Sequence, residues 1–391
     1  MTKKLIYLDH AATTPVDSEV VKAMQPYFSK KYGNPSSIYS LGRESKQALE
    51  VAREKAVKIL NCQPEEIIFT GSGTESDNQA IIGAALANQA RGRHIITSLI
   101  EHHAVLHACE FLESQGFEVT YLPVSKEGLV DLTELKNAIR PETILVSLIW
   151  ANNEIGTVQP ISEIAKIIKE KNSETFFHTD ACQAAGFFDL DVQELGVDLL
   201  TLNGSKIYGP KGTGLLYVKK GLPIASIIHG GAQEGSKRAG TENVPGIIGL
   251  VKALELVQAD REQENKRLIG LRDKLIEGLL NIPKVILNGH PTKRLPNNVN
   301  VTIADVEGEA MLLHLDQQGI CVSTGSACTS GSLEPSHVIL ALGQSFDLAH
   351  GSLRFSLGKA NTQEDIDYVL EVFPEIIEKL RRMSPVNLAI N

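Results

Sequence analysis

Between about residues 63 and 218, short runs of β-branched and apolar residues alternate with longer amphipathic stretches. In residues 161–168, for example, isoleucine and alanine recur at the 3.6-residue spacing of one helix face. This alternation is typical of parallel strands joined by crossover helices, so we predict an α/β fold. The runs predicted to be strands are residues 66–70, 94–98, 119–122, 143–149, 175–179, 199–202 and 214–218.

The pattern changes in the last third of the chain. One long helical pattern covers residues 246–280 and ends before a turn at Pro283. A strand (299–303), a helix (307–318), a loop of small residues and a last strand and helix follow. This less regular alternation is typical of an α+β unit, so we expect the long helix to connect the α/β core to a second domain.

Composition and charge narrow the function classes. Of the 391 residues, 42% are hydrophobic and 22% charged, which is enough apolar material for a sizeable core. The 38 Lys and Arg against 47 Asp and Glu give a net charge of −9, so no overall positive field attracts nucleic acid or an anionic membrane. No apolar run approaches the roughly 18 residues of a membrane helix, and we expect a cytosolic protein.

The five cysteines are an odd number without CxxC spacing, which argues against a disulfide framework and a structural zinc cluster. Cys328 lies among Ser, Thr, Gly and Ala residues, whose side chains offer little surface for anchoring. We therefore expect a mobile loop that carries a reactive thiol, with an idle loop thiol as the alternative. Cys321, between Ile320 and Val322, fits a buried structural cysteine.

A glycine-containing turn follows the strand predicted at residues 66–70. Ser72 and Glu75 have the spacing of a capping box, so a helix is predicted to begin here. The free N–H groups of Gly73 and its neighbours, with the Thr74 hydroxyl, could hold a phosphate. The Lys of a Walker loop and the third Gly of a dinucleotide fingerprint are missing, and an ordinary turn is the alternative.

Two charged residues stand at predicted strand ends. Lys206 comes just after residues 199–202, where a partly desolvated amine could form a Schiff base with an aldehyde cofactor. The alternative is a solvated turn lysine, which is our interpretation of Lys211. Asp180 follows residues 175–179 and could pair with a pyridinium nitrogen, or cap a helix.

Histidines and an arginine complete the candidates. His103 and His107 have the i, i+4 spacing of metal ligands, but the HExxH arrangement is absent and no metal site is expected. Stacking or proton transfer by an imidazole, or an ordinary core or surface histidine, fits this segment better. Arg354 alternates with Leu353 and Phe355, so a strand could present its guanidinium to a substrate carboxylate. A surface salt bridge is the alternative.

Together these motifs resemble the pyridoxal-phosphate-dependent cysteine desulfurases of the IscS/NifS type, within the class V aminotransferases. The resemblance runs from Tyr7-Leu-Asp-His-Ala-Ala-Thr-Thr-Pro through Gly33-Asn-Pro-Ser-Ser to the Arg354 strand, and Gly325-Ser-Ala-Cys328-Thr-Ser is similar to the group I loop. It implies a fold type I structure like that of aspartate aminotransferase. A large cofactor-binding domain over residues 15–258 and a small α+β domain over residues 1–14 and 259–391, with the Cys328 loop and Arg354, are then expected.

The resemblance also implies residue roles. Lys206 is similar to the Schiff-base lysine, Asp180 to the partner of the pyridine nitrogen, and His102 to the ring that stacks on the cofactor and moves protons. The further positions are Gly73, Thr74, Asn203 and Ser205 at the cofactor and its phosphate, Asn153 and Gln183 near its phenolic oxygen, Thr241 reaching the phosphate of the other subunit, and Asn34 and Arg354 at the substrate carboxylate. Ser205 departs from the family, which usually has a phosphate-binding histidine there.

The implied activity converts L-cysteine to L-alanine with a persulfide on Cys328. The implied partners are a second copy of the chain and a sulfur-acceptor protein such as an iron-sulfur scaffold, with no nucleic acid or membrane. Within enzymes, a selenocysteine lyase or a cysteine sulfinate desulfinase is the alternative, since the same pocket would serve. A sulfur-relay protein without catalysis is the alternative of another class.

Overall fold

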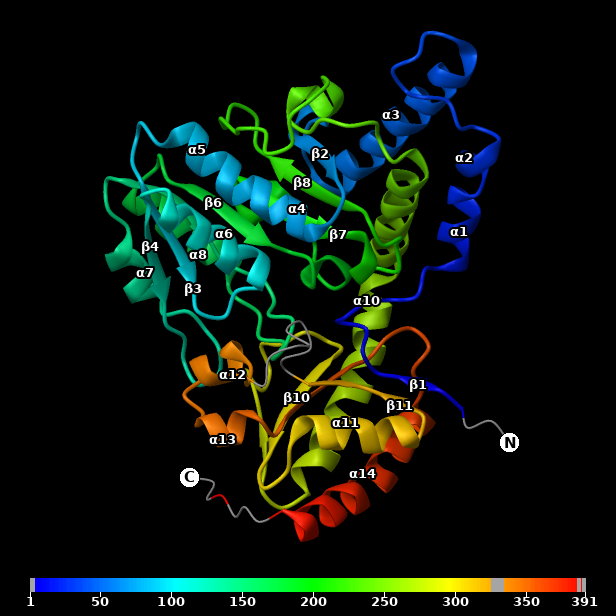
Figure 1. The fold of residues 1–391 in the computed structure, drawn as a ribbon, viewed down its shortest axis with the longest axis vertical. Coiled ribbons are helices and arrows are strands. Elements are labelled where there is room, and N and C mark those ends of the chain that lie inside the picture. Colours follow the sequence, from blue (N-terminus) through cyan, green and yellow to red (C-terminus); the bar gives the residue numbers. More distant parts are fainter. Residues whose placement is uncertain (1–3, 325–333, 385–387, 389–391) are drawn as a thin grey trace.

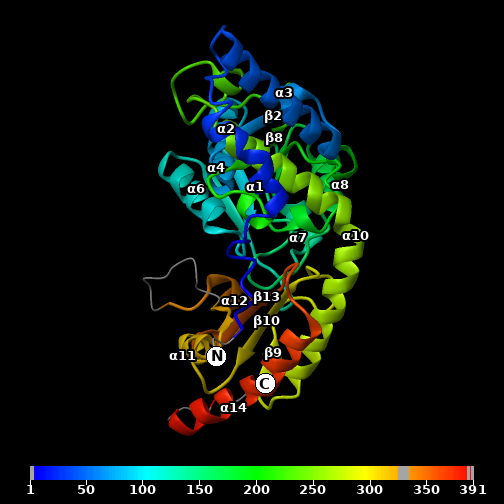
Figure 2. The same ribbon diagram turned by 90° about the vertical axis from the view of Figure 1, so that its right-hand side faces the viewer.

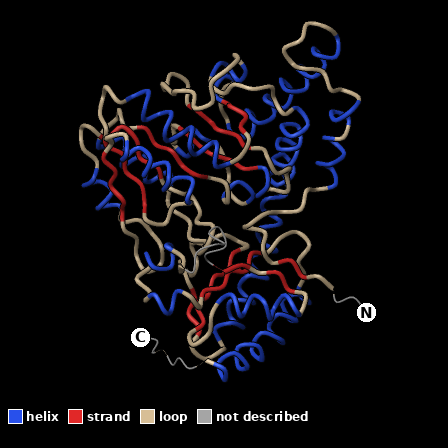
Figure 3. Tube along the Cα trace, in the orientation of Figure 1, coloured by secondary structure: helices blue, strands red, loops and turns tan. Residues whose placement is uncertain are grey.

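The computed structural model describes residues 4–324, 334–384 and 388, and folds them around two separate groups of strands (Figures 1 and 3). In the larger sheet the described strands have the order β2-β8-β7-β6-β5-β3-β4. Their bounds are β2 (Ile67–Thr70), β3 (His94–Ser98), β4 (Glu118–Leu122), β5 (Thr143–Ser147), β6 (Phe176–Asp180), β7 (Leu199–Asn203) and β8 (Gly214–Val218). All the strands predicted between residues 66 and 218 are confirmed, with ends shifted by at most two residues.

The larger sheet is mostly parallel, as predicted, and β8 is the exception. It runs antiparallel to both of its neighbours, β2 and β7. Only a short turn with one helical segment, η4 (Gly204–Lys206), separates β7 from β8. A parallel return needs a crossover of about a dozen or more residues, so this short connection forces the opposite direction.

Helices cover both faces of this sheet. Alternate strand residues face opposite sides, so Ile67 and Phe69 pack in one apolar cluster while Ile68 packs in another. In Figure 2, α4 and α6 lie on one side of the sheet and α8 and α10 on the other. The bounds are α1 (Ser18–Met24), α2 (Pro26–Ser29), α3 (Ser40–Leu60), α4 (Gly73–Asn78), η2 (Gln79–Gly83), α5 (Ala84–Asn88), α6 (His103–Ser114), α7 (Leu132–Ala138), α8 (Ile161–Lys171), η3 (Ala184–Gly186), α9 (Val192–Leu195) and α10 (Val244–Leu280).

The smaller sheet has the order β12-β13-β10-β9, and its described neighbours are all antiparallel. Beside it, β1 near the N-terminus pairs with β11. The bounds are β1 (Ile6–Tyr7), β9 (Val285–Leu287), β10 (Asn298–Ile303), β11 (Ile320–Cys321), β12 (Ser323–Thr324) and β13 (Ser352–Ser356), with α11 (Gly308–Gln317), α12 (His337–Ala341), α13 (Phe346–Ala349) and α14 (Gln363–Met383).

The long helix α10 joins the two halves, as its sequence pattern predicted (Figure 2). Leu250 and Leu254 belong to the apolar core of the larger sheet, whereas Leu268 and Leu275 belong to that of the smaller sheet. Ile6 and Leu8 pack in the second core as well. On this basis we propose the division into residues 15–258 and residues 1–14 with 259–391. None of the helices described here is both long and apolar enough to cross a membrane.

Candidate active site

Lys206 lies in η4, directly beyond the carboxyl end of β7. Its Nζ donates to the carbonyl oxygens of Ala11 (2.9 Å) and Ala12 (2.6 Å), so the N-terminal segment fixes the amine. The side-chain amide of Gln183 donates to the same Ala11 carbonyl at 2.9 Å. Lys206 is half-buried, and the solvated-turn alternative is therefore wrong for it, while Lys211 is exposed as expected.

Asp180 ends β6 and is almost fully buried, with 5% of its surface exposed. Its Oδ1 accepts from the backbone N–H of Cys182 at 2.9 Å. The short helix η3 follows, but its N-cap is Gln183, so the alternative of Asp180 as a helix cap is wrong. The carboxylate stands at the sheet edge where the parallel strands end, which is where α/β folds bind ligands.

His102 lies at the same edge and caps α6, because its Nδ1 accepts from the N–H of Ala104 at 3.1 Å. Burial lowers the pKa of His102, the charge of Asp180 opposes this shift, and that of Lys206 adds to it. The three side chains therefore lie close enough to interact electrostatically. A neutral ring whose Nδ1 accepts carries its proton on Nε2, which leaves that N–H available to a bound molecule.

The start of α4 approaches the ends of β6 and β7 closely. A Cβ on Gly73 would meet the Cys182 sulfur at 2.8 Å and the Asn203 side chain at 3.2 Å. The predicted cap is confirmed in part: Ser72 Oγ accepts from the N–H of Glu75 at 3.1 Å. The Glu75 carboxylate instead accepts from the N–H of Gly71 and pairs with Arg238.

Three hydroxyl and amide side chains surround this helix start. Thr74 is exposed in the first turn of α4. Asn203 ends β7, and its Oδ1 accepts from the N–H and the Oγ of Ser205, each at 3.1 Å. These groups and the N-terminal N–H groups of α4 offer hydrogen-bond donors at the positive end of a helix dipole, a suitable environment for a phosphate.

Arg354 lies on the middle of β13 and is 3% exposed, so the surface salt-bridge alternative is wrong. Its Nη2 donates to Asp9 Oδ1 at 2.9 Å and its Nη1 to the carbonyl of Asn153 at 3.0 Å. Among the described residues its buried Nε has no hydrogen-bond partner. Nη1 and Nη2 carry two N–H groups each, and these two bonds use one of each, so the guanidinium can still donate to a further acceptor, as recognition of a carboxylate requires.

The other predicted residues are Asn34, Thr241 and Cys328. Asn34 is exposed in the loop between α2 and α3, which lies far from β13 in both views (Figures 1 and 2). Thr241 is exposed shortly before α10. Cys328 and the loop expected to be mobile lie outside the described residues.

Several residues at the site were not found from the sequence. They are Asp9, Glu101, Glu154, Ser336 and His337, all of which are at least half-buried. Their partners are far away in the chain: Asp9 lies 345 positions from Arg354, and Glu154 lies 182 positions from Ser336. Glu154 directly follows Asn153 in the sequence. This neighbourhood is the one local signal that could have indicated Glu154 as a site residue.

The sequence predicts that His103 and His107 do not form a metal site. Their ring centroids are 5.2 Å apart, and the ring of His337 lies 4.7 Å from His103. Within residues 4–324, 334–384 and 388, no group of three or more His, Cys, Asp or Glu side chains is arranged to hold a metal ion.

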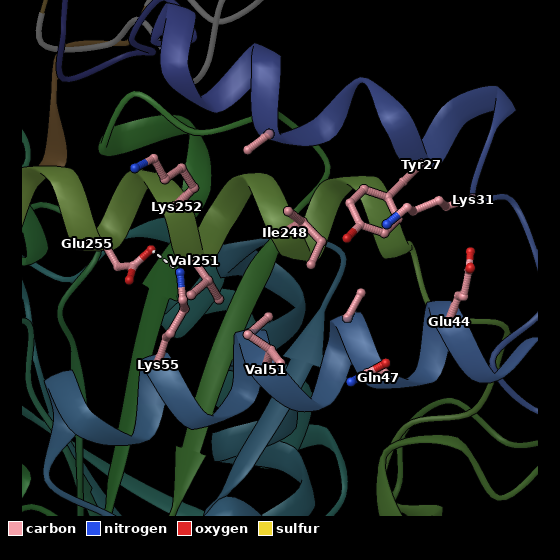
Figure 4. A pocket seen from close by; sticks show the side chains of 13 residues that line it. Tyr27, Lys31, Glu44, Gln47, Val51, Lys55, Ile248, Val251, Lys252 and Glu255 are labelled. Carbon is pink, nitrogen blue, oxygen red and sulfur yellow. Dashed lines mark hydrogen bonds and ion pairs between the residues drawn. The ribbon is translucent and has the colours of Figure 1, made fainter.

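A separate pocket of about 490 Å³ lies between α1, α2, α3 and α10 (Figure 4). Tyr27, Ile248 and Val251 line it, and an ion pair between Lys55 and Glu255 (2.9 Å) stands at one side. None of its lining residues is a predicted site residue. By contrast, Lys206 and Gln183 line a small cavity of about 30 Å³ between the two halves of the chain.

The chain is similar to known proteins over nearly its whole length. The aminotransferase class-V family model matches residues 6–369. Cysteine desulfurase IscS of Methanosarcina thermophila is 60% identical over 383 residues, 98% of this chain and 94% of that protein. Cysteine desulfurase IscS of Dictyoglomus turgidum is 56% identical over 384 residues, 98% of this chain and 97% of that protein. The solved structure of a NifS-like protein has a TM-score of 0.91 at 39% identity, covering 96% of this chain and all of that one.

Proposed function

The chain belongs to the aminotransferase class-V family and is a cysteine desulfurase, and from this premise we propose that Lys206, Asp180, His102 and Cys328 carry the reaction. The overall change converts L-cysteine and the Cys328 thiol to L-alanine and a Cys328 persulfide. The observation that best supports these assignments is that Asp180 ends β6, Lys206 is held just beyond β7 and His102 caps α6 after β3, so that all three follow strand ends at one edge of the sheet.

We infer that the cofactor is pyridoxal 5′-phosphate, on which this family depends. The residues present fit this cofactor. Gly73 lies too close to Cys182 and Asn203 for a side chain, so only backbone stands at the helix start. The buried carboxylate of Asp180 and the fixed amine of Lys206 lie at the ends of the neighbouring strands β6 and β7. Gly73, Thr74, Asn203 and Ser205 would hold the phosphate, Asn153 and Gln183 would lie near the phenolic oxygen, and Asp180 would hold a proton on the ring nitrogen. When bound, the cofactor supplies an electron sink for a carbanion at the substrate Cα.

Lys206 would hold the cofactor through its aldehyde, and its Nζ would take the proton from the substrate Cα. The carbonyls of Ala11 and Ala12 hold its Nζ at the strand end, so the amine has little freedom to turn away. His102 is neutral and has its Nε2–H free of the α6 cap, which suits it to stack on the ring and to pass protons between substrate and Lys206.

Cys328 attacks the sulfur of the bound cysteine as a thiolate. The substrate Cβ–S bond breaks, a new S–S bond forms on Cys328, and protonation of the remaining carbon skeleton gives alanine. Arg354 orients the substrate through its carboxylate, for which the unpartnered Nε and its position on a buried strand are suited. The persulfide sulfur then passes to an acceptor protein such as an iron-sulfur scaffold.

We propose that the working unit is a homodimer. Asn34 and Thr241 are both exposed, and the loop between α2 and α3 that carries Asn34 lies away from β13, the strand of Arg354 (Figure 2). A second copy that brings its Asn34 to the substrate carboxylate and its Thr241 to the phosphate would complete the site.

The direct test supplies the purified protein with pyridoxal phosphate and measures alanine and sulfide from L-cysteine in the presence of a reducing thiol. Cys328→Ala should keep the visible cofactor absorbance and lose at least 99% of sulfide production, because about 3 kcal/mol or more of barrier lowering depends on the nucleophile. Cys321→Ala is the matched control and should stay near wild type.

Sulfide production retained by Cys328→Ala would contradict the nucleophile assignment. Faster alanine release from selenocysteine or cysteine sulfinate than from cysteine would favour the alternative lyase or desulfinase activities. Absence of alanine from all three substrates would favour a relay protein.

A further inference from the structure

The chain that follows the Cys328 segment is attached to the larger sheet at its first helix. Ser336 and His337 begin α12, eight and nine positions after Cys328, and both are shielded from solvent. Each of them bonds to a loop that leaves the carboxyl edge of the larger sheet. The start of α12 is thus tied to the part of the molecule that carries the proposed cofactor site.

The first bond joins Ser336 to Glu154. Ser336 Oγ donates to Glu154 Oε2 at 2.5 Å and at the same time accepts from the N–H groups of Val338 and Ile339, so it caps α12. Glu154 is itself fixed without Ser336, because its carbonyl accepts from the side-chain amides of Asn298 and Asn300, each at 3.1 Å. A buried, fixed carboxylate is a rigid acceptor for the cap.

The second bond joins His337 to the loop after β3. The ring Nε2 of His337 donates to the carbonyl of Glu101 at 3.0 Å, and the ring of His103 lies edge-on at 4.7 Å. Burial lowers the pKa of both imidazoles, so they are neutral and do not repel each other at pH 7.

An apolar cluster joins the same segments as these two hydrogen bonds. Ile100 and Ile155, which are next to Glu101 and Glu154 in the chain, pack against Val338 and Ile339 of α12, and all four are buried. The attachment points are also neighbours of proposed site residues, since Glu101 precedes His102 and Glu154 follows Asn153. Bonds and packing therefore place α12 in a fixed position relative to the cofactor site.

We propose that Ser336 and Glu154 are positioning residues for sulfur transfer: they fix the C-terminal end of the Cys328 segment beside the cofactor site. This inference rests on the proposed function. A tether of eight residues limits the reach of the Cys328 thiol to about 28 Å from Ser336. A tether whose end is fixed raises the effective concentration of that thiol at the substrate sulfur, and a released end lowers it.

The test uses holoenzyme in a single turnover with L-cysteine. The persulfide on Cys328 is followed by quenching, alkylation and mass spectrometry, and cysteine binding is followed separately by the change in cofactor absorbance. Ser336→Ala removes both the cap and the bond to Glu154, whereas Glu154→Ala removes only the acceptor. Ser336→Thr keeps the hydroxyl. Ser345→Ala is the matched control, because Ser345 caps α13 and its side chain bonds to no group outside that helix in the described part of the chain.

We expect persulfide formation to slow about tenfold in Ser336→Ala and Glu154→Ala, which corresponds to the loss of one buried hydrogen bond. The cysteine affinity should change less than about twofold. Amide hydrogen exchange in residues 337–341 should become faster in the same two variants. Ser336→Thr should restore the rate, and Ser345→Ala should match wild type.

Wild-type persulfide rates in both variants would overturn the inference. So would equal losses of cysteine binding and persulfide formation, because these indicate general damage to the site. A wild-type chain that forms neither alanine nor persulfide would instead overturn the proposed function.

Discussion

One buried carboxyl group behind the site, that of Glu101, has a shifted pKa. Glu101 is 1% exposed and accepts from Ser98 and from the N–H of Ile149, while its Oε2 has no partner among the described residues. Burial raises the pKa of Glu101 from its ordinary 4.5 to about 8. The negative charge of nearby Asp180 is a smaller contribution to this raised pKa, and Glu101 is protonated over much of the neutral range.

This shift predicts a pH dependence of stability. Because the folded pKa lies above the unfolded one, the folded state binds the extra proton, and the stabilisation present below pH 4.5 is lost as pH rises toward 8. Between pH 5 and pH 8, the melting temperature of wild type should fall by about 5 °C more than that of Glu101→Gln. Thermal unfolding of both proteins across this range measures it, and parallel curves would contradict the pKa shift.

At the residue scale, chemistry was predictable where a reactive side chain follows a strand end. Lys206 and Asp180 were identified in this way, because the strand pattern fixes which edge they share. Arg354 was identified instead from the alternation of polar and apolar residues within its own strand. Asp9 and Glu154 were not identified, because a carboxylate reveals its partner only when the fold brings distant segments together. The sequence left open whether Arg354 forms a surface ion pair, and its burial on β13 decides against it.

Among elements, the strands of the larger sheet were predictable because helices bury both of their faces. Such strands are nearly continuous apolar runs, and polar turns bound them. The direction of β8 was not predictable from its own residues, since it depends on the length of the connection from β7. Short elements such as β12 (Ser323–Thr324) and α12 carry too few residues for a periodic signal, and tertiary contacts define them.

The start of α4 gives a prediction at this scale. Gly73→Ala should lower the affinity for pyridoxal phosphate at least about tenfold, because the new Cβ cannot fit 2.8 Å from the Cys182 sulfur without moving the helix start. Titration of the apoprotein by absorbance measures it. In Gly270→Ala, where nothing lies within 4 Å of the new Cβ in α10, the affinity should stay unchanged.

A second substitution sharpens this test. Removing the contacting sulfur in the double variant Gly73→Ala/Cys182→Ala should recover part of the lost affinity. Unchanged affinity in Gly73→Ala would show that the helix start does not contact the cofactor phosphate.

For the whole molecule, the division into two sheets joined by α10 was predictable from the change in pattern near residue 246. The residues that a second copy would contribute were inferred from the family resemblance alone, because a single sequence does not show the distances between two chains. The proposed site residues Lys206, Asp180, His102 and Arg354 are buried or half-buried in one chain, whereas Asn34 and Thr241 are exposed. This difference in exposure is what a shared site at a dimer interface predicts.

The dimer can be tested by mixing two inactive forms. Lys206→Ala and Asn34→Ala should each be impaired, and dissociated and reassociated mixtures should regain about a quarter of wild-type activity, since half of the dimers are hybrids with one complete site. Light scattering should give twice the 42.5 kDa chain mass. Absence of any recovery in hybrids of confirmed dimeric mass would contradict the placement of Asn34 in the partner's site.

Borohydride reduction followed by peptide mapping shows whether the amine of Lys206 binds the cofactor aldehyde. Reduction of the protein with bound pyridoxal phosphate should add one stable pyridoxyl group to the peptide that contains Lys206, and none to Lys211 five positions away. In Lys206→Ala no lysine should be labelled at stoichiometric yield. A label on Lys211 alone, or no stable label on the wild-type chain, would contradict the account.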